Sequence, residues 1–368
     1  MAELLKNIYN QKFFENFTNA FSEVVPGFTK EVFLDQIYDK DWGDKELKQR
    51  MRHIATALKT HLKGDYAEKI NSIIGGIEML QKYGAPKDSF EYMLFPDFIE
   101  QYGLDNYDTS INAFEVITQF TSCEFAVRPF IIMYPQKMID QMLKWSKHKH
   151  PSVRRLASEG CRPRLPWAIA IPAFKENPSP ILPILENLRN DNSESVRRSV
   201  ANNLNDISKD NADIVINLVK KWQGESKETD WLIKHACRTL LKQGNQQVLE
   251  LFGFGSIEEI KIKDLKILTP VVKVGGSLDF EFQLVNASKS ISKIRLEYAI
   301  YYQKSNGSLS KKVFSISEKN YPNNSSSTIK RKQHFKVITT RKLYPGLHQL
   351  ALIVNGYELE KNDFELVE

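Results

Sequence analysis

Apolar residues follow two different periods along this chain, and the change falls near residue 255. Before it, apolar side chains recur every three or four residues, as in the segment 47–58, which is the spacing of one helix face. After it, apolar and polar residues alternate through 261–268, 277–285 and 295–302, which is typical of strands with one buried face. The pattern predicts an all-α region over 1–257 and an all-β region over 258–368.

The all-β region has the features of an immunoglobulin-like sandwich. Turn-rich breaks separate about seven short strands, the number that this fold requires. The segment 341–356 resembles the hairpin between the last two strands of such a domain, with Tyr344 as a candidate tyrosine corner. The three cysteines do not form a pair at the usual spacing, but many domains of this type lack the disulfide.

A repeat lies in the second half of the helical region. The sequence Ser-Val-Arg-Arg at 152–155 returns at 195–198, an offset of 43 residues. This length fits repeats of the HEAT or armadillo kind, in which paired helices stack and place equivalent positions along one concave face. We therefore predict a HEAT-like repeat solenoid, with Ser152 and Ser195 as helix caps.

Composition and charge narrow the class of protein. The 368 residues are 42% hydrophobic and 26% charged, which is ordinary for a folded protein. No signal peptide or apolar run of membrane-spanning length is visible, so we expect a cytoplasmic protein without a membrane partner. The spacing of Cys123, Cys161 and Cys237 indicates no disulfide framework, zinc site or iron–sulfur cluster, and we expect buried thiols, no metal and no cofactor.

The net charge of +6 is unevenly distributed. Residues 124–209 carry 14 Lys and Arg against 8 Asp and Glu, and residues 261–368 carry 18 against 10. The segments 1–123 and 210–260 are acidic, with 13 against 19 and 6 against 8. Two basic blocks of this kind favour a polyanionic partner such as nucleic acid, although many solvated faces are also basic.

Carboxylates accompany the repeated arginines. Arg155 and Glu159 lie four residues apart on one helix face, and Arg198, Asn202 and Asp206 follow the same step in the second copy. One interpretation of the first pair is an intrahelical ion pair on a solvated surface, worth only a few tenths of a kcal/mol. The other is that acids on successive helices meet on the concave face.

Glu124, in the helix-like stretch 121–128, adds a third carboxylate to this set. Acids in a nucleic-acid groove repel phosphate, so they favour a bound cation. An alkylated purine carries positive charge, and its deoxyribose becomes oxocarbenium-like as the glycosidic bond breaks. No Walker loop, His-Glu-x-x-His or Gly-x-Ser-x-Gly motif indicates a competing chemistry.

Trp167 follows a turn stiffened by two prolines, and it has two interpretations. It is either a stacking platform for a positively charged base or a core anchor between helices. We expect Trp145, Trp222 and Trp231 to lie in the core. As DNA contacts we predict the following polar residues, some of which must point away from any one ligand: Arg154, Arg155, Arg162, Arg164, Arg197, Arg198 and Asn202.

Three segments, 122–130, 153–167 and 195–209, together resemble the AlkC branch of bacterial DNA alkylation-repair glycosylases. The resemblance spans the helical region. It implies HEAT-like repeats, monofunctional hydrolysis of the N-glycosidic bond of cationic alkylated bases such as 3-methyladenine, and no cofactor. Some members of this branch carry an appended immunoglobulin-like domain, which the tail looks like.

Carried over to matching positions, the resemblance makes Glu124, Glu159 and Asp206 the acidic active-site residues and Trp167 an aromatic wall. It makes Arg155 and Arg162 nearby DNA contacts. The expected partner is double-stranded DNA containing alkylated bases, with nucleoid association when bound and no obligate protein partner. Cys123 stands where a small polar residue is expected, which should alter packing more than chemistry.

Two further hypotheses remain open. The chain is alternatively a non-catalytic HEAT-repeat scaffold that binds DNA or a protein partner. The charge of the tail also predicts that the sandwich contacts the DNA backbone through loops containing 311–312, 330–332 and 341–342.

Overall fold

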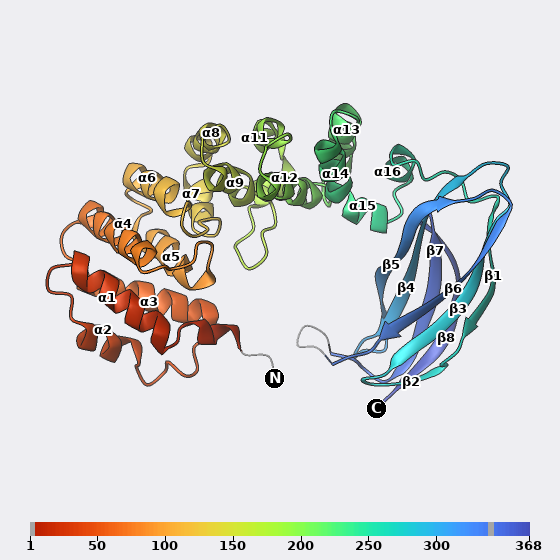
Figure 1. Cartoon of the computed structure of the whole chain (residues 1–368), viewed down its shortest axis with the longest axis horizontal. Coiled ribbons are helices and arrows are strands. Elements are labelled where there is room, and N and C mark those ends of the chain that lie inside the picture. Colours follow the sequence, from red (N-terminus) through yellow and green to blue (C-terminus); the bar gives the residue numbers. More distant parts are fainter. Residues whose placement is uncertain (1–3, 338–341) are drawn as a thin grey trace. The chain divides into compact units, whose positions relative to one another are not determined.

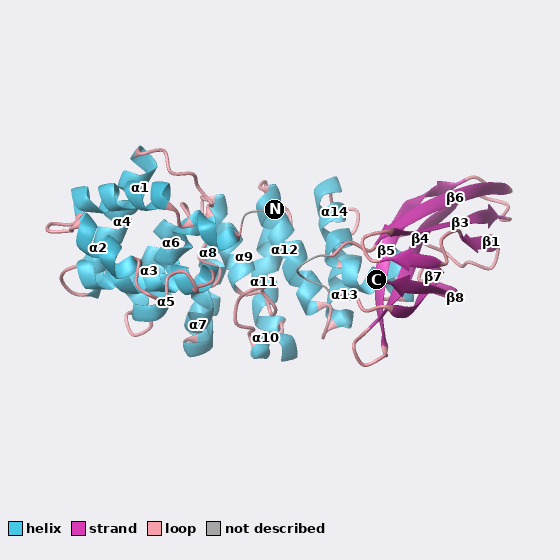
Figure 2. Ribbon diagram, turned by 90° about the horizontal axis from the view of Figure 1, so that it is seen from below, coloured by secondary structure: helices cyan, strands magenta, loops and turns pink. Residues whose placement is uncertain are grey.

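The computed structural model describes residues 4–337 and 342–368, in which sixteen α-helices and three short 3-10 helices, labelled η, precede eight β-strands (Figures 1 and 2). The helices are η1 (Leu5–Ile8), α1 (Gln11–Val24), α2 (Lys30–Ile37), α3 (Leu47–His61), α4 (Tyr66–Lys82), η2 (Phe90–Met93), α5 (Leu94–Tyr102), α6 (Tyr107–Ile117), α7 (Val127–Met133), α8 (Pro135–Trp145), α9 (Pro151–Gly160), α10 (Pro172–Glu176), η3 (Ser179–Ile181), α11 (Leu182–Leu188), α12 (Glu194–Ile207), α13 (Ala212–Trp222), α14 (Lys227–Ala236), α15 (Arg238–Lys242) and α16 (Gln246–Leu251). The strands are β1 (Ile260–Ile267), β2 (Val271–Lys273), β3 (Ser277–Asn286), β4 (Ser292–Gln303), β5 (Leu309–Tyr321), β6 (Ser325–His334), β7 (Gly346–Val354) and β8 (Tyr357–Val367). The predicted change from helix to strand near residue 255 is confirmed.

The chain divides into two compact units, and the first holds residues up to 211 together with 222–236. Within it, α8 and α11 lie side by side in one row, and α9 and α12 lie in a second row packed against them (Figure 1). Helix α12 packs in turn on α14. Each helix pair therefore contacts the next pair along the chain, which is compatible with stacked repeats.

The first arginine of each Ser-Val-Arg-Arg copy has the same structural function. The Arg154 guanidinium Nη1 donates to the carbonyls of His148 and Lys149 at 2.9 Å each. Arg197 Nη1 donates to the equivalent carbonyls, those of residues 191 and 192, at 2.6 and 3.1 Å. Both arginines tie the loop before a helix to that helix, so the sequence repeat is also a structural repeat.

The predicted helix caps are displaced by two residues. Helix α9 begins at Pro151, and its cap is His150, whose Nδ1 accepts from the backbone N–H of Ser152 at 3.2 Å. Helix α12 begins at Glu194 after Ser193. The proline explains the first shift, because it has no N–H to satisfy and its φ suits the first helical position.

The second unit holds residues 212–221 and 237–368 and contains the sandwich. Its sheets have the strand orders β1-β3-β6 and β2-β8-β7-β4-β5. There are eight strands where about seven were predicted, because Pro270 separates β1 from β2. Strand β2 leaves the sheet of β1 and pairs in parallel with β8 in the other sheet.

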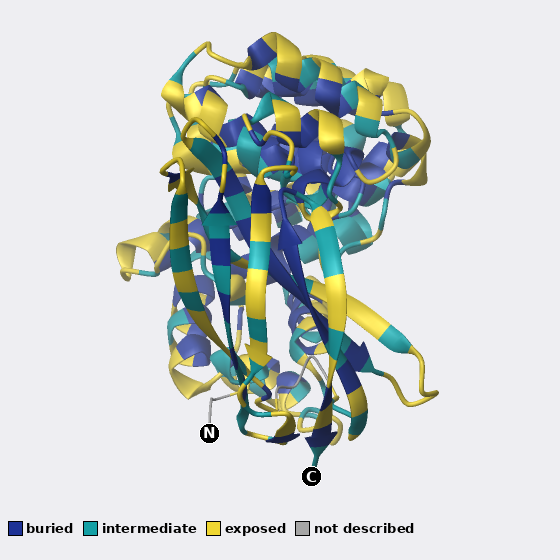
Figure 3. Ribbon diagram, turned by 90° about the vertical axis from the view of Figure 1, so that its right-hand side faces the viewer, coloured by how far each residue is buried: buried dark blue, intermediate teal, exposed yellow. Residues whose placement is uncertain are grey.

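Alternation along the strands builds the core of the sandwich, as the sequence predicts. In β3 every second residue is buried, and these side chains form one apolar cluster with those of β7 and β4. Figure 3 shows buried and more exposed residues following one another along the strands. The helices α15 and α16 belong to this unit, in which Lys293 Nζ donates to the Phe252 carbonyl at 2.7 Å. The domain boundary at 257/258 stays a prediction.

Of the three basic groups predicted in loops, two lie in strands, and Lys342 of the third lies in the loop before β7. Residues 311–312 belong to β5 and residues 330–332 to β6, where Lys330 and Lys332 pair with Glu281 and Asp279 across the sheet. That part of the loop prediction is wrong, because the alternation continues through these lysines on the exposed face. Arg341 lies outside the described residues. The Tyr344 hydroxyl makes no hydrogen bond to another residue that the structure describes, so a tyrosine corner is not observed.

No helix in the described residues combines the length and the apolar content that crossing a lipid bilayer requires.

His348 predicts a pH-dependent stability of the sandwich. Its ring is fully buried beside Phe335 and Phe364, Nδ1 donates to the Gly346 carbonyl, and Nε2 has no partner among the described residues. Burial lowers the pKa of His348, so the unfolded chain binds a proton below about pH 6.5 that the folded chain resists. This contribution to stability is present above about pH 6.5 and is lost as the pH falls below it, by at most about 1.4 kcal/mol per pH unit.

In urea unfolding between pH 7.5 and 5.5, we expect H348F to lose less stability than the wild type. The matched control is H334F, which removes an exposed histidine from the same sandwich and should keep the wild-type slope. Parallel pH profiles for wild type and H348F would contradict the assignment.

Candidate functional site

A buried arginine joins two of the predicted acids. Arg162 Nη1 donates to Glu159 Oε1 at 2.6 Å, and its Nε and Nη2 both reach Asp206 Oδ2 at 2.8 Å. Glu159 lies in the last turn of α9 and Asp206 in the last turn of α12. All three residues are buried, so each charge depends on the others for compensation. Burial disfavours the charge of Arg162, but the two carboxylates outweigh burial and raise its pKa.

The remaining oxygens of these acids are also bound. Glu159 Oε2 accepts from the Ser199 hydroxyl at 2.6 Å, and Asp206 Oδ1 accepts from Lys209 Nζ at 2.8 Å. Ser199 was missed in the sequence. Its signal is the spacing of Ser199, Asn202 and Asp206 along α12, which places three polar residues on one helix face.

Glu124 belongs to a second ion pair next to the first. Arg155 Nη1 donates to Glu124 Oε2 and to the Ser122 hydroxyl at 3.0 Å each, and Nη2 reaches Glu124 Oε1 at 3.3 Å. The predicted helix around Glu124 is wrong, since this residue lies in a turn before α7. The intrahelical pair of Arg155 with Glu159 is also not formed, because Arg155 turns to Glu124.

A pocket of about 450 Å³ opens between α9 and α12 at these residues. Glu159 is the predicted acid that lines it, whereas Asp206 is covered behind Arg162. The pocket brings together acidic, basic and neutral polar side chains from both copies of the repeat. It is lined by Arg155, Glu159, Glu194, Ser195, Arg198, Ser199 and Asn202.

The turn that follows α9 is held from inside by Arg128. This fully buried guanidinium donates to the carbonyls of Gly160, Arg162 and Ile169 at 2.9, 2.8 and 2.5 Å. Burial lowers the pKa of Arg128 to about 10. Sequence reasoning did not single out this residue, since nothing in its spacing distinguishes it from a surface arginine.

Trp167 is exposed at the end of this turn. Its exposed fraction is 60%, so the core-anchor interpretation is wrong. Its φ of +67° lies in the left-handed region, which costs a bulky residue about 1–2 kcal/mol. The indole ring lies 6.2 Å from the ring of Phe90, which is also exposed. The turn therefore holds an aromatic surface toward solvent.

The other predicted polar residues separate into two groups. Arg154 is occupied by Asp191 and by two loop carbonyls, and Arg164 pairs with Asp210. Arg198 and Asn202 line the pocket, where Arg198 pairs with Glu194, and both also contact a second aromatic group.

That second group comes from α14. The Arg198 guanidinium lies 5.7 Å from the ring centre of Trp231, and Trp231 stacks on His235 at 5.2 Å. His235 Nε2 in turn lies 3.2 Å from Asn202 Oδ1. Trp231 is 40% exposed, so its predicted core position is wrong, whereas the core positions of Trp145 and Trp222 are confirmed.

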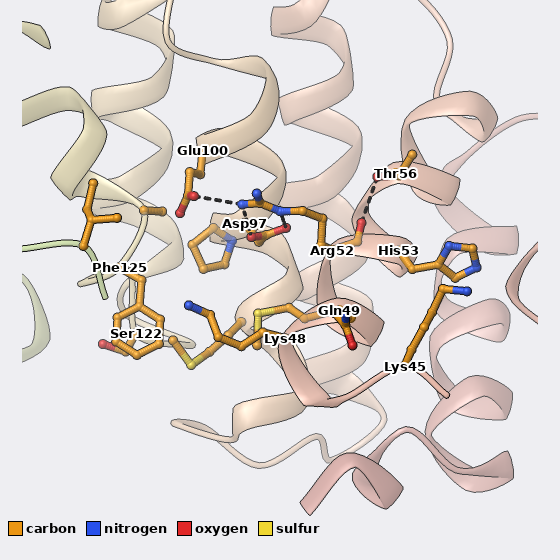
Figure 4. A pocket seen from close by; sticks show the side chains of 15 residues that line it. Lys45, Lys48, Gln49, Arg52, His53, Thr56, Asp97, Glu100, Ser122 and Phe125 are labelled. Atoms are coloured by element: carbon orange, nitrogen blue, oxygen red, sulfur yellow. Dashed lines mark hydrogen bonds and ion pairs between the residues drawn. The ribbon is translucent and has the colours of Figure 1, made fainter. Parts of the chain in front are cut away.

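A larger cavity of about 680 Å³ lies between α3, α5 and the turn that carries Glu124 (Figure 4). Its polar wall includes Lys48 and Arg52, and Arg52 is neutralised by Asp97 and Glu100. This cavity could not be predicted from local sequence patterns, because its walls come from segments far apart in the chain.

The three cysteines are buried and unpaired, as predicted, and burial raises the pKa of the Cys161 thiol to about 12. Within residues 4–337 and 342–368, no three His, Cys, Asp or Glu side chains gather in an arrangement that could hold a metal ion.

Comparison with known families covers both parts of the chain. Residues 48–240 match the family described as "DNA alkylation repair enzyme". Residues 261–368 match the family described as "Uncharacterised protein YhaZ, C-terminal Ig-like domain". The predicted immunoglobulin-like character of the tail is thereby confirmed.

Two similar proteins match over the full chain. The sequence is 43% identical over 366 residues to "Uncharacterized protein YhaZ" of Bacillus subtilis (strain 168), covering 100% of both. The structure is similar to "Pseudomonas fluorescens alkylpurine DNA glycosylase AlkC bound to DNA containing an abasic site analog", with a TM-score of 0.93, 34% identity and 100% of each chain covered. The resemblance to the AlkC branch is confirmed.

The ion pairs of Arg162 with Glu159 and Asp206 predict that removing this cation greatly lowers the free energy of unfolding. R162M leaves Glu159 and Asp206 buried without their shared guanidinium, and we expect a loss of about 3–5 kcal/mol in the free energy of unfolding. R164M removes an arginine from the same turn whose pair with Asp210 is more exposed, and should cost about 1 kcal/mol or less. Urea unfolding monitored by far-UV circular dichroism measures both losses. Equal losses in the two variants would show that the buried ion pairs of Arg162 stabilise the fold no more than the exposed pair of Arg164.

Proposed function

We propose that this chain, which belongs to the DNA alkylation repair enzyme family, is a DNA glycosylase acting on cationic alkylated bases in double-stranded DNA. The observation that carries the proposal is the buried Glu159–Arg162–Asp206 bridge at the edge of a polar pocket, with the Glu124–Arg155 pair beside it. Acidic side chains next to arginines suit a substrate that presents both a cation and phosphates. The helices of the first unit are HEAT-like repeats in this proposal, and DNA binding places the protein at the nucleoid.

Glu159 is the acid closest to the substrate in this mechanism, because it lines the pocket. As the bond from an alkylated base to its sugar breaks, positive charge develops on the deoxyribose. A carboxylate about 4 Å away, at an effective dielectric near 20, stabilises that charge by about 4 kcal/mol, or roughly a thousandfold in rate. The base already carries its charge, so it leaves without a proton donor.

Glu124 and Asp206 have different surroundings, and we assign them different tasks. Glu124 is held by Arg155 and Ser122 beside the pocket, so it shares with Glu159 the orientation of the attacking water and the stabilisation of the sugar. Asp206 is buried behind Arg162 and acts by fixing that guanidinium against Glu159. Water attack at the sugar leaves an abasic site and an intact strand, as in a monofunctional glycosylase.

The DNA contacts of the proposal follow from which cations still face solvent. Arg155, Arg198 and Asn202 line the pocket, Arg164 lies nearby on the turn, and Trp167 offers its ring to a base. Arg154 and Arg162, which were predicted as DNA contacts, have side chains that are only 17% and 8% exposed, against 31% for Arg155 and Arg164 and 56% for Arg198, and they are left out of this set. Their tasks are to hold a loop and to bind the acids.

E159Q tests the central step. It keeps the size of the side chain but removes its charge, so we expect release of 3-methyladenine from methylated duplex to fall about a hundredfold or more. The matched control is E176Q, which neutralises an exposed acid of α10 outside the pocket and should change the rate by about twofold or less. Free base is measured by chromatography, and strand cleavage after hot alkali reports the abasic product. Equal rates for E159Q and wild type would remove Glu159 from the mechanism, and no release by the wild type would favour a binding scaffold.

W167A tests the aromatic wall. Stacking contributes about 1–3 kcal/mol per base, so we expect W167A to lower single-turnover excision by about tenfold or more while affinity for undamaged DNA changes less. I169A truncates another exposed apolar residue two positions away and serves as the control. Matched losses of excision and of affinity in W167A would make Trp167 a general binding residue.

A further inference from the structure

The turn that presents Trp167 is fixed at almost every peptide. Pro163 and Pro166 restrict two φ angles. The Arg128 guanidinium donates hydrogen bonds to the carbonyls of residues 160, 162 and 169. The backbone N–H of Ala168 closes the tip by donating to the Leu165 carbonyl at 3.2 Å. None of these contacts involves the carbonyl of Trp167 itself, although this residue has the left-handed backbone that a bulky side chain disfavours.

Lys48 binds that carbonyl from a distant part of the chain. Its Nζ donates to the Trp167 oxygen at 2.7 Å, across 119 residues of sequence. The same ammonium group lies 5.2 Å from the ring centre of Phe125, the residue next to Glu124. Figure 4 shows the Lys48 side chain extending from α3 toward Phe125 along the wall of the larger cavity. One side chain thus connects α3 to the two turns that carry Trp167 and Glu124.

The charges around Lys48 indicate that this contact is its main interaction. The other cations of the same wall are paired with acids, Lys45 with Asp39 at 2.8 Å and Arg52 with Asp97 at 2.9 Å. Among the described residues, no carboxylate lies within ion-pair distance of Lys48. A charged donor on a carbonyl forms a stronger bond than a neutral one and has a defined direction.

We propose that Lys48 is a positioning residue that holds Trp167 in its left-handed conformation and keeps the Glu124 turn at a fixed distance from it. A bond to the carbonyl fixes the plane of the peptide after Trp167, which restrains ψ at this residue and, with it, the direction of the Cα–Cβ bond that carries the indole ring. Without the bond, the backbone is free to leave the disfavoured region. The consequence for catalysis rests on the function proposed above, but the effect on the conformation of Trp167 does not.

The test compares K48M with K45M, and each removes one lysine from the same cavity wall with the same loss of charge. Because both variants lose one positive charge from the same wall, a general loss of attraction for DNA is the same in both. Only Lys48 is bonded to the Trp167 turn, whereas Lys45 pairs with Asp39. K48R retains a charged donor that can reach the carbonyl and should restore the wild-type behaviour. Lys48 is exposed and Lys45 keeps 18% of its side chain exposed, and neither lies in the core, so all three variants are expected to fold.

The first measurement uses the free protein and no DNA. The emission of Trp167 is obtained as the difference between each variant and the same variant with W167F, and its quenching by acrylamide is titrated. We expect K48M to shift the emission and the quenching constant of Trp167, and K45M and K48R to leave both at wild-type values. If K48M and K45M give the same Trp167 signal, the positioning proposal is wrong, whether or not the protein excises bases.

The second measurement is single-turnover excision from methylated duplex, beside affinity for undamaged DNA. We expect K48M to lower the rate by about three- to tenfold more than K45M, in line with the loss of one hydrogen bond, with equal affinities for the two variants. In a W167A background the difference between them should vanish, because Lys48 acts through Trp167. A difference between K48M and K45M that persists in the W167A background would overturn the proposal. Absence of excision by the wild type would refute the proposed function, but the fluorescence result would still decide the role of Lys48.

Discussion

The arrangement of the site depends on one buried guanidinium. Arg162 follows directly after α9, and it can satisfy its charge only if Glu159 at the end of α9 and Asp206 at the end of α12 both lie within reach. Buried charges without partners cost several kcal/mol, so this requirement fixes the relative position of two neighbouring repeats. It also places two acids next to arginines that would otherwise attract phosphate alone.

The two adjacent arginines of the repeated motif have different contacts, so one motif contributes both to stability and to the pocket. Consecutive residues on a helix point about 100° apart, so the first arginine of each copy turns back to the preceding loop and the second turns to the pocket. Arg154 and Arg197 therefore hold backbone carbonyls, while Arg155 and Arg198 line the space between α9 and α12. A count of basic residues cannot separate these tasks, but the angular step of the helix does.

The turn between α9 and α10 shows how protein groups maintain an unfavourable conformation at a candidate functional position. Cations approach its carbonyls from two sides, Arg128 from the interior and Lys48 from α3. Strained backbone at a solvent-exposed aromatic residue persists only when its surroundings determine it. The exposure of Trp167 on this rigid support is the feature that most clearly separates it from Trp145 and Trp222, which fill the core.

The sequence alone determined the two architectures and their order, because periods of 3.6 and two residues follow from helix and strand geometry without any knowledge of neighbours. It also determined the 43-residue repeat and, through the segments around Glu124, Glu159 and Asp206, the family. The tertiary structure decided which charges meet. Arg155 pairs with Glu124 and not with Glu159. The lysines of β6 face acids of β3 and do not lie in loops. Such pairings depend on segments that only tertiary packing brings together. Lys48 and Trp167 are separated by 119 residues, and their contact has no signature in local spacing.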